Sequence, residues 1–260
     1  ANSMSLLKDA VSKPYGMILV TGPTGSGKST TLYSILTQLN TPERNIITVE
    51  DPVEYQIAGI TQINVRSDIG FTFAAGLRAI LRQSPDVILI GEIRDAETAD
   101  IAVKASLTGH LVMSTLHTNN ASQAVTRLLD MGLEPFLVAS SLIMSSAQRL
   151  IRLICERCRE PDEPAPQLLK RIGLPGETKF FRGKGCRFCN NTGFYGRSAL
   201  LEIIMIDDVI REMIVKGSSS EQIEDYAVRN LGMKTLRQEA MEKAKNGLTT
   251  LEEVLRITTE

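Results

Sequence analysis

The sequence predicts an α/β fold in which helices wrap a mostly parallel β-sheet. Between residues 16 and 154, short apolar runs alternate with helical patterns, and this alternation is typical of parallel strands joined by helices. The apolar runs themselves have the character of buried strands. We predict strands over residues 17–20, 46–49, 87–90 and 111–114.

Two segments depart from this pattern. Residues 55–65 alternate weakly around Gly59, which predicts a hairpin that projects from the sheet. After Leu153 the composition changes to cysteines, then to proline and acidic residues, then to glycine. This change indicates an inserted, loop-rich module.

The last part of the chain has a helical pattern that begins at Val209. Thr249 and Glu252 form a predicted capping box for the final helix. We therefore expect three segments along the chain. They are a core over residues 1–154, the inserted module over 155–192, and a strand with a helical subdomain over 193–260.

The composition restricts the classes of function. The 260 residues are 43% hydrophobic and 23% charged, as in globular chains with a sizeable core. With 29 Lys and Arg against 30 Asp and Glu, the net charge is -1, and no basic block offers a stripe for nucleic-acid phosphates. The apolar runs are far shorter than the roughly 18 residues of a membrane span, and no secretory signal is recognisable. We expect a cytoplasmic protein that neither binds nucleic acid nor crosses a membrane.

A glycine-rich segment follows the first predicted strand. Residues 22–29 (GPTGSGKS) match the P-loop pattern G-x-x-x-x-G-K-[ST] and precede a helical pattern over residues 30–39. Gly25 and Gly27 allow backbone N–H groups to turn inward around phosphates, and the helix N-terminus adds the positive end of its dipole. Lys28 is expected to reach the β- and γ-phosphates of a nucleotide, and Ser29 to offer a hydroxyl to Mg²⁺. A simple glycine-rich turn is the alternative.

Carboxylates follow two other predicted strands. Glu92 comes just after the run over residues 87–90, which places it at the carboxyl edge of the sheet beside the P-loop. The Asp usual at such a strand end is absent, so Glu92 is expected to act on Mg²⁺ or its water shell. Residues 50–54 (EDPVE) place three carboxylates at the same edge, where one can orient or activate water. A solvated strand end and a charged turn are the alternatives.

His110 and His117 are the two histidines of the chain, and they flank the apolar run over residues 111–115. His117 is expected at the carboxyl edge, where ligands bind in open α/β sheets, and His110 at the opposite end of the strand. Each is a candidate sensor of the γ-phosphate. A structural role is the alternative for His110.

Four cysteines form two close pairs with C-x-x-C spacing, Cys155 with Cys158 and Cys186 with Cys189. In a reducing compartment this pattern favours a metal over disulfides. Two such pairs close a tetrahedral zinc site with no open position, so we expect a structural ion. Unrelated buried thiols and a redox pair are the alternatives. The span over residues 159–185 is expected to hold a hairpin or a short helix.

Arginines are plentiful around these motifs. For each of them, contact with a phosphate is one interpretation, and a solvated or salt-bridged position on the surface is the alternative. They are Arg78, Arg82, Arg94, Arg127, Arg149 and Arg197. The guanine-reading pattern Asn-Lys-x-Asp does not follow the P-loop, so ATP is the expected nucleotide.

Together and in this order, four motifs resemble those of the secretion ATPases of type II secretion and type IV pilus assembly. Residues 22–30 resemble the Walker A segment of that family, 48–54 its Asp box, 90–95 its Walker B segment and 108–119 its His box. The resemblance covers nearly the whole chain and implies a RecA-like P-loop NTPase fold that binds ATP and Mg²⁺. The implied nucleotide contacts are Gly22, Pro23, Thr24, Gly25, Ser26, Gly27, Lys28, Ser29 and Thr30.

The resemblance also implies roles for individual side chains. Glu54 would activate or orient water, and Glu92 would act near Mg²⁺. Lys28 and both histidines, His110 and His117, would belong to the active site.

The zinc module carries two further implications of the resemblance. Its four cysteines match a tetracysteine motif of the assembly and secretion branch, which the retraction ATPases of the family lack. Arg197, in the segment after the last cysteine pair, is expected to lie against the adenine.

The resemblance implies a homo-hexamer that drives assembly of a type IV pilus or a type II secretion pseudopilus through an inner-membrane platform protein. The expected location is cytoplasmic and peripheral at the inner membrane, with membrane association through partners only. Because few residues precede the P-loop, the chain is expected to be a truncated motor portion. Two other classes stay open: a zinc-containing, ATP-dependent nucleic-acid translocase and a nucleotide-binding scaffold without catalysis.

Overall fold

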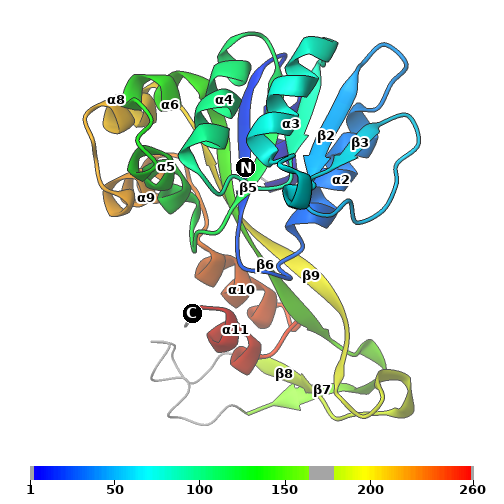
Figure 1. Ribbon diagram of the computed structural model, residues 1–260. Coiled ribbons are helices and arrows are strands. Elements are labelled where there is room, and N and C mark those ends of the chain that lie inside the picture. The colour runs from blue at the N-terminus through cyan, green and yellow to red at the C-terminus, as the bar shows by residue number, and fades with distance from the viewer. Residues whose placement is uncertain (1–2, 164–178, 259–260) are drawn as a thin grey trace. The chain divides into compact units, whose positions relative to one another are not determined.

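Seven strands of the described chain form one sheet in the computed structural model, which describes residues 3–163 and 179–258 (Figure 1). Their order is β3-β2-β4-β5-β1-β6-β9. β1 pairs in parallel with β5 and β6, β2 with β3 and β4, and β4 with β5, so the predicted mostly parallel sheet is confirmed. The strands are β1 (Gly16–Thr21), β2 (Ile46–Glu50), β3 (Thr61–Asn64), β4 (Val87–Ile90), β5 (Leu111–Leu116), β6 (Leu142–Ile154) and β9 (Phe194–Met205).

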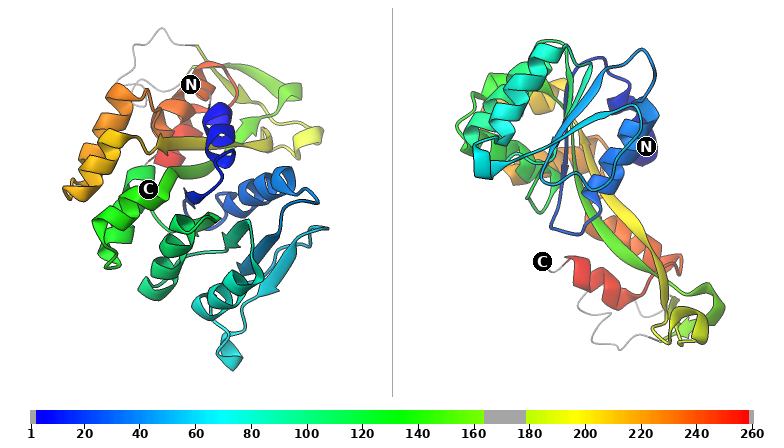
Figure 2. Two further views of the ribbon diagram at one scale, coloured as in Figure 1. Left: turned by 90° about the horizontal axis from the view of Figure 1, so that it is seen from above. Right: turned by 45° about the vertical axis from the view of Figure 1, so that its right-hand side comes forward.

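Helices cover both faces of the strands around β1. Figure 2 shows α1 (Ser3–Val11) and α2 (Lys28–Leu39) on one face, and α3 (Phe73–Ile80) and α4 (Ala96–Leu107) on the other. The arrangement is that of a doubly wound α/β protein. The other described α-helices are α5 (Ala121–Asp130), α6 (Pro135–Ser141), α8 (Asp208–Val215), α9 (Ser220–Asn230), α10 (Leu236–Lys245) and α11 (Leu251–Thr258), and short 3-10 turns span Ser67–Ile69, Leu81–Gln83, Glu156–Cys158 and Arg187–Cys189.

The strands nearest the P-loop are buried along their whole length. Every residue of β1, β2, β4 and β5 is buried. A strand covered on both faces is a continuous apolar run, which is why the four predicted strands are confirmed. The helix predicted over residues 30–39 is also confirmed, as α2, although it begins at Lys28.

The hairpin predicted over residues 55–65 is wrong. Residues 61–64 form β3, which pairs in parallel with β2, with Ile47 opposite Thr61 and Glu50 opposite Asn64. The turn at Gly59 is present, with φ of 85°, but it leads into a single edge strand. Alternating polarity marks a half-buried strand without specifying the direction of its partner.

Internal contacts divide the chain into two compact units. Unit 1 is Ala1–Ala147 with Glu202–Met233, and unit 2 is Gln148–Leu201 with Lys234–Glu260. The helices after Val209 were correctly predicted, but α8 and α9 belong to unit 1 whereas α10 and α11 belong to unit 2. The division into segments 1–154, 155–192 and 193–260 stays a prediction.

Unit 2 contains a small two-stranded sheet. β7 (Arg159–Asp162) pairs antiparallel with β8 (Phe180–Gly183). The hairpin expected within residues 159–185 thus has both of its strands, and residues 164–178 lie outside the described part of the chain.

The last helix of unit 2 is held by a buried carboxylate. Glu253 of α11 is 1% exposed and forms ion pairs with Arg152 of β6 and with Arg256. The predicted capping box is wrong: Thr250 accepts the capping hydrogen bond from the N–H of Glu253, and the Thr249 hydroxyl donates to the backbone oxygen of Arg152 instead. The Thr249 hydroxyl, which the local sequence pattern predicts as the helix cap, therefore bonds the backbone of β6 instead.

Within residues 3–163 and 179–258, no helix has the combined length and hydropathy of a membrane span.

Candidate active site and metal centre

The P-loop has the backbone shape that phosphate binding requires. Gly25 and Gly27 adopt φ angles of 78° and 87°, which side chains other than glycine rarely tolerate. Gly27 is the residue before α2, so the loop opens directly onto the N-terminus of that helix. The Lys28 Nζ donates to the backbone oxygens of Gly22 at 2.8 Å and Pro23 at 3.0 Å. The loop thus curls around the Lys28 ammonium group. The backbone N–H groups of the loop and the positive end of the α2 dipole favour the binding of an anion.

Four parallel strands bring the predicted site segments to one edge of the sheet. The register pairs Thr21 of β1 with Leu116 of β5, and Val49 of β2 with Ile90 of β4. Because β4 also pairs with β5, the ends of β2, β4, β5 and β1 are successive neighbours. The P-loop, Glu92, His117 and the segment over residues 50–54 therefore all leave the sheet at its carboxyl edge, where ligands bind in such folds.

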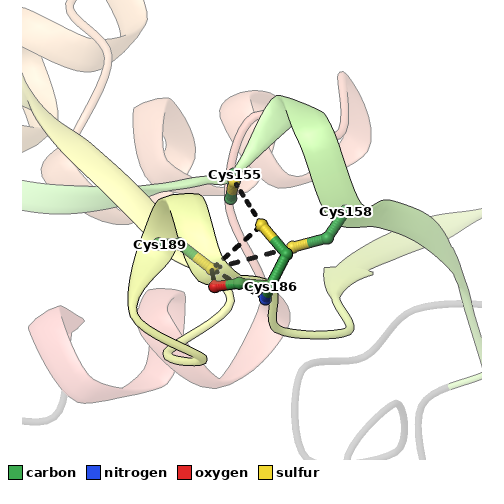
Figure 3. Close-up of side chains that lie close together, drawn as sticks. All are labelled: Cys155, Cys158, Cys186 and Cys189. Atoms are coloured by element: carbon green, nitrogen blue, oxygen red, sulfur yellow. Dashed lines mark hydrogen bonds between the residues drawn. The ribbon is translucent and has the colours of Figure 1, made fainter.

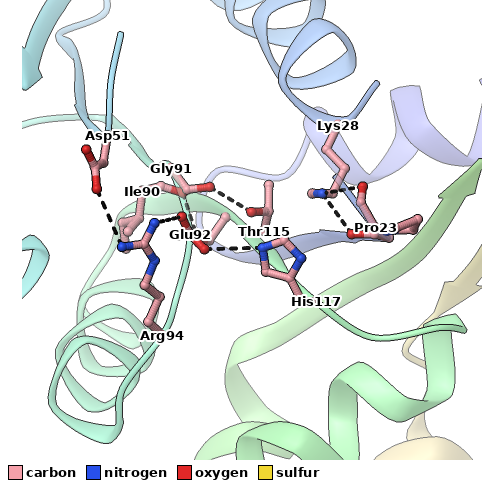
Figure 4. A network of polar contacts seen from close by, with 11 residues as sticks. Pro23, Lys28, Asp51, Ile90, Gly91, Glu92, Arg94, Thr115 and His117 are labelled. Atoms are coloured by element: carbon pink, nitrogen blue, oxygen red, sulfur yellow. Dashed lines mark hydrogen bonds and ion pairs between the residues drawn. The ribbon is translucent and has the colours of Figure 1, made fainter. Parts of the chain in front are cut away.

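Glu92 stands at the centre of a polar network at this edge (Figure 4). One carboxylate oxygen accepts a hydrogen bond from Arg94, and the other lies 3.3 Å from the His117 Nε2. Arg94 also reaches Asp51 at 3.5 Å. The Arg94 hydrogen bond is the main cause of a lowered Glu92 pKa, and it outweighs burial, with His117 adding to the lowering. Glu92 is thus held as a charged acceptor.

Hydroxyl groups of β5 fix the strand end that carries Glu92. Ser114 donates to the backbone oxygen of Ile90 at 2.9 Å, and Thr115 donates to that of Gly91 at 2.7 Å. Both hydroxyls come from buried positions. They give the β4–β5 pair side-chain bonds in addition to the backbone ladder, which restricts the backbone just before Glu92.

Glu50 and Glu54 of the acidic segment have different surroundings. Glu50 is buried at the end of β2 and accepts hydrogen bonds of 2.5 Å from Tyr33 and Thr48. Glu54 is exposed, and its N–H donates to the Tyr33 hydroxyl at 3.2 Å. Glu50 is therefore part of the core, whereas Glu54 is exposed, and the water-orienting role of Glu54 stays a prediction.

The structure does not bring His110 to this edge. His110 precedes β5 at its amino end, where its backbone oxygen accepts from the Gly16 N–H. Its Nδ1 lies 2.9 Å from the backbone oxygen of Ala105 in the last turn of α4. This contact adds a side-chain partner to a carbonyl that also accepts from the Thr108 and His110 N–H groups, and it indicates a structural role at the end of α4.

The sequence patterns missed two side chains of the site. Arg94 was one of several undifferentiated arginines, and only its contacts with Glu92 and Asp51 single it out. Tyr33 had no signal in the sequence beyond its place on the P-loop helix. Among the other arginines, Arg78 pairs with Glu97, Arg149 is buried, and Arg197 is an exposed residue of β9 in unit 2.

The four cysteines of unit 2 converge as predicted (Figure 3). Their sulfur atoms all lie within 4.8 Å of one another. Three of the separations are 3.9 Å for Cys155 and Cys186, 3.8 Å for Cys158 and Cys189, and 3.7 Å for Cys186 and Cys189. A tetrahedral zinc ion with bonds of about 2.3 Å requires sulfur–sulfur edges of about 3.8 Å. The donor set therefore fits a four-thiolate zinc ion.

The fold and the phosphate loop define an α/β P-loop protein. A family model described as type II/IV secretion system protein matches residues 1–256. The chain belongs to this family.

Named relatives agree with this assignment. The chain is 52% identical over 257 residues to the type IV pilus assembly ATPase PilB of Thermus thermophilus, covering 97% of this chain and 29% of that protein. It is 53% identical over 256 residues to the type II secretion system protein E of Dickeya dadantii, covering 98% of this chain and 51% of that protein. The chain thus spans about half the length of the second relative and less than a third of the first.

A solved structure has the same fold over the full chain. The pilus retraction motor PilT, determined with bound ADP, has a TM-score of 0.74 at 30% sequence identity. The match covers 100% of this chain and 65% of PilT. The RecA-like P-loop fold implied by the motifs is therefore confirmed.

Proposed function

We propose that the chain is the ATP-hydrolysing motor portion of a machine that assembles a type IV pilus or a type II secretion pseudopilus. The observation that carries the proposal is the meeting of four site segments at the ends of neighbouring strands: the P-loop, Glu92, His117 and the segment with Glu54. It is supported by relatives of more than 50% identity that are named for pilus assembly and type II secretion. PilT adds a structural relative with a bound nucleotide.

In the proposed reaction the P-loop binds the phosphates of ATP. The backbone N–H groups between Gly22 and Ser29 surround the phosphates, and the N-terminus of α2 adds its dipole. Lys28 exchanges its two backbone acceptors, the oxygens of Gly22 and Pro23, for β- and γ-phosphate oxygens. Thr30 completes the proposed contact set, Gly22 through Thr30.

Hydrolysis then depends on the carboxylates. Glu54 orients the attacking water and accepts a proton as the bond between the γ-phosphorus and its bridging oxygen breaks. Ser29 and Glu92 are the residues that would hold Mg²⁺, directly or through its water shell. When bound there, Mg²⁺ would offset the charge that develops on the phosphate oxygens. His117, in contact with Glu92, is proposed to sense the γ-phosphate.

The zinc ion has a structural role in this proposal. Cys155, Cys158, Cys186 and Cys189 would hold it, and a site closed by four thiolates has no position for a substrate. Its contribution is to fold the loops that carry the two cysteine pairs. Arg197 is proposed to contact the adenine.

The assembled state of the motor is proposed from the resemblance of the motifs to those of the family. We propose a homo-hexamer at the cytoplasmic face of the inner membrane, bound there through a platform protein. The names of these relatives, a type IV pilus assembly ATPase and a type II secretion system protein E, are consistent with a motor that acts in such a machine.

Phosphate release at steady state tests the proposal. K28A and E92Q should each reduce ATP turnover at least about a hundredfold while the circular dichroism spectrum stays that of the wild type. K104A and E212Q are matched controls, because Lys104 and Glu212 form exposed helical pairs with Asp100 and Lys216. Turnover retained in K28A would refute the assignment, and so would turnover by the wild type that depends on added DNA.

A further inference from the structure

A buried carboxylate lies next to the loop that carries Glu54, and the proposed mechanism does not use it. Glu50 is 5% exposed. Its Oε2 accepts from the Tyr33 hydroxyl at 2.5 Å, and its Oε1 accepts from Thr48 at 2.5 Å and from Gln62 at 3.4 Å. All three donors are neutral. Because a buried carboxylate is costly to desolvate, its presence at this position points to a function.

Tyr33 connects this carboxylate to the backbone of Glu54. The tyrosine is 1% exposed, and its hydroxyl accepts from the Glu54 N–H at 3.2 Å while it donates to Glu50. Burial, and then the hydrogen bond to Glu50, raise the pKa of Tyr33, so the hydroxyl keeps its proton and remains a donor. Tyr33 belongs to α2, which begins at Lys28. A single helix therefore joins the phosphate-binding lysine to the backbone of Glu54.

Side chains of β3 hold the loop on both sides of Glu54. Asn64 accepts from the Val53 N–H at 2.7 Å. Gln62 accepts from the Ile57 N–H at 2.7 Å and donates to the Tyr55 backbone oxygen at 3.2 Å. The β3 contacts flank Glu54, whereas the Tyr33 hydroxyl bonds the backbone of Glu54 itself and ties that residue to α2. Asn40, at the end of α2, bonds the loop farther along, at the backbone oxygen of Ala58.

We propose that Tyr33 and Glu50 are positioning residues of ATP hydrolysis: the Tyr33 hydroxyl, oriented by Glu50, sets the place of Glu54 relative to the P-loop helix. The inference rests on the proposed role of Glu54. It divides the acidic segment into a supporting carboxylate at its start and an acting carboxylate at its end. Neither positioning residue needs to touch nucleotide or water.

The first test is Y33F, which removes the hydroxyl and keeps the ring. It should lower kcat at least about tenfold, because small displacements of a reacting group have effects of this size or larger. The KM for ATP and the Kd of a fluorescent ADP analogue should stay within about twofold, since the P-loop contacts are unchanged. Y55F is the matched control, because Tyr55 packs edge-on against the Tyr33 ring with centroids 4.7 Å apart. It should leave kcat unchanged.

A second test asks whether Tyr33 acts through Glu54. In an E54Q background, adding Y33F should change kcat less than about twofold, since residues that act as a unit are not additive. A full additional loss would show that Tyr33 acts elsewhere and would overturn the inference. Should Y33F not fold, E50D gives the same test, because it withdraws the carboxylate from the Tyr33 hydroxyl while the tyrosine stays.

The outcomes separate this inference from the proposed function. A folded Y33F protein with wild-type kcat overturns the positioning role and leaves the ATPase assignment intact. A wild-type protein that does not hydrolyse ATP overturns both the ATPase assignment and the positioning role. E54Q with full turnover overturns the role of Glu54 and the positioning role that rests on it.

Discussion

The guanidinium of Arg94 donates a hydrogen bond to Glu92, and the same side chain lies 3.5 Å from Asp51 on the neighbouring segment. Arg94 thus joins the ends of β4 and β2, and its contact is the main reason that the pKa of Glu92 is lowered. A carboxylate that stays charged suits a group that holds a cation or orients its waters, and it is unsuited to donating a proton.

The pH dependence of turnover tests this relationship. Arg94 favours the charged form of Glu92, so R94Q should raise the pKa of Glu92 and let it take up a proton at higher pH. The acid limb of the kcat profile should then move to higher pH. R229Q is the control, because Arg229 forms an exposed pair with Asp225 within α9. An unchanged acid limb in R94Q would show that Glu92 does not determine it.

The two histidines should respond differently to substitution. H117A removes the contact with Glu92 and should lower kcat at least about tenfold. H110A removes the contact with the Ala105 carbonyl and should cost about 1 kcal/mol of stability with kcat within about twofold. Urea unfolding and phosphate release measure the two effects. A large loss of kcat in stable H110A protein would contradict the structural role.

The acid stability of the chain should depend on Glu253. Burial alone would raise the pKa of Glu253, but the hydrogen bonds from Arg256 and Arg152 outweigh it and lower the pKa to about 2. The contribution to stability is therefore fully present above about pH 4.5 and is lost as the pH falls towards 2. E253Q should lower stability by about 1 to 3 kcal/mol at pH 7 and by much less near pH 2.

Urea unfolding of E253Q and wild type across this range measures the difference. D208N is the control, because Asp208 forms an exposed pair with Arg211. An E253Q penalty that is the same at pH 7 and near pH 2 would mean that the charge of Glu253 does not stabilise α11.

Metal analysis tests the cysteine cluster independently of turnover. The freshly purified protein should hold about one zinc ion per chain, and C189S should hold less than about half an equivalent because three thiolates no longer close the site. Chelation should lower the unfolding temperature of the wild type and have little effect on C189S. Full zinc content in C189S would place the metal elsewhere.

Much of the fold was predictable because buried parallel strands have a simple signature. Helices cover both faces of these strands, so nearly all of their side chains are buried and apolar. Apolar character alone therefore identifies the runs over residues 17–20, 46–49, 87–90 and 111–114. β3 was misjudged because its pairing direction depends on where the chain turns after Glu50. Thr249 was misjudged because a tertiary contact with Arg152 competes with the local cap.

The candidate site was predictable to a similar degree. The P-loop, Glu92 and the cysteine pairs have fixed spacings, and the position of His110 at the amino end of β5 followed from the strand direction. The contact of Arg94 with Glu92 and the link from Tyr33 to Glu54 depend on side-chain placement across separate segments. No spacing in the sequence encodes such contacts.

A structure of the protein with a non-hydrolysable ATP analogue and Mg²⁺ tests the central claim most directly. The account predicts that the triphosphate lies in the P-loop, with Lys28 moved from the Gly22 and Pro23 oxygens to phosphate oxygens. The carboxylates of Glu54 and Glu92 should reach the γ-phosphate or Mg²⁺ directly or through one water. A nucleotide bound elsewhere, or these carboxylates out of reach in every subunit, would contradict it.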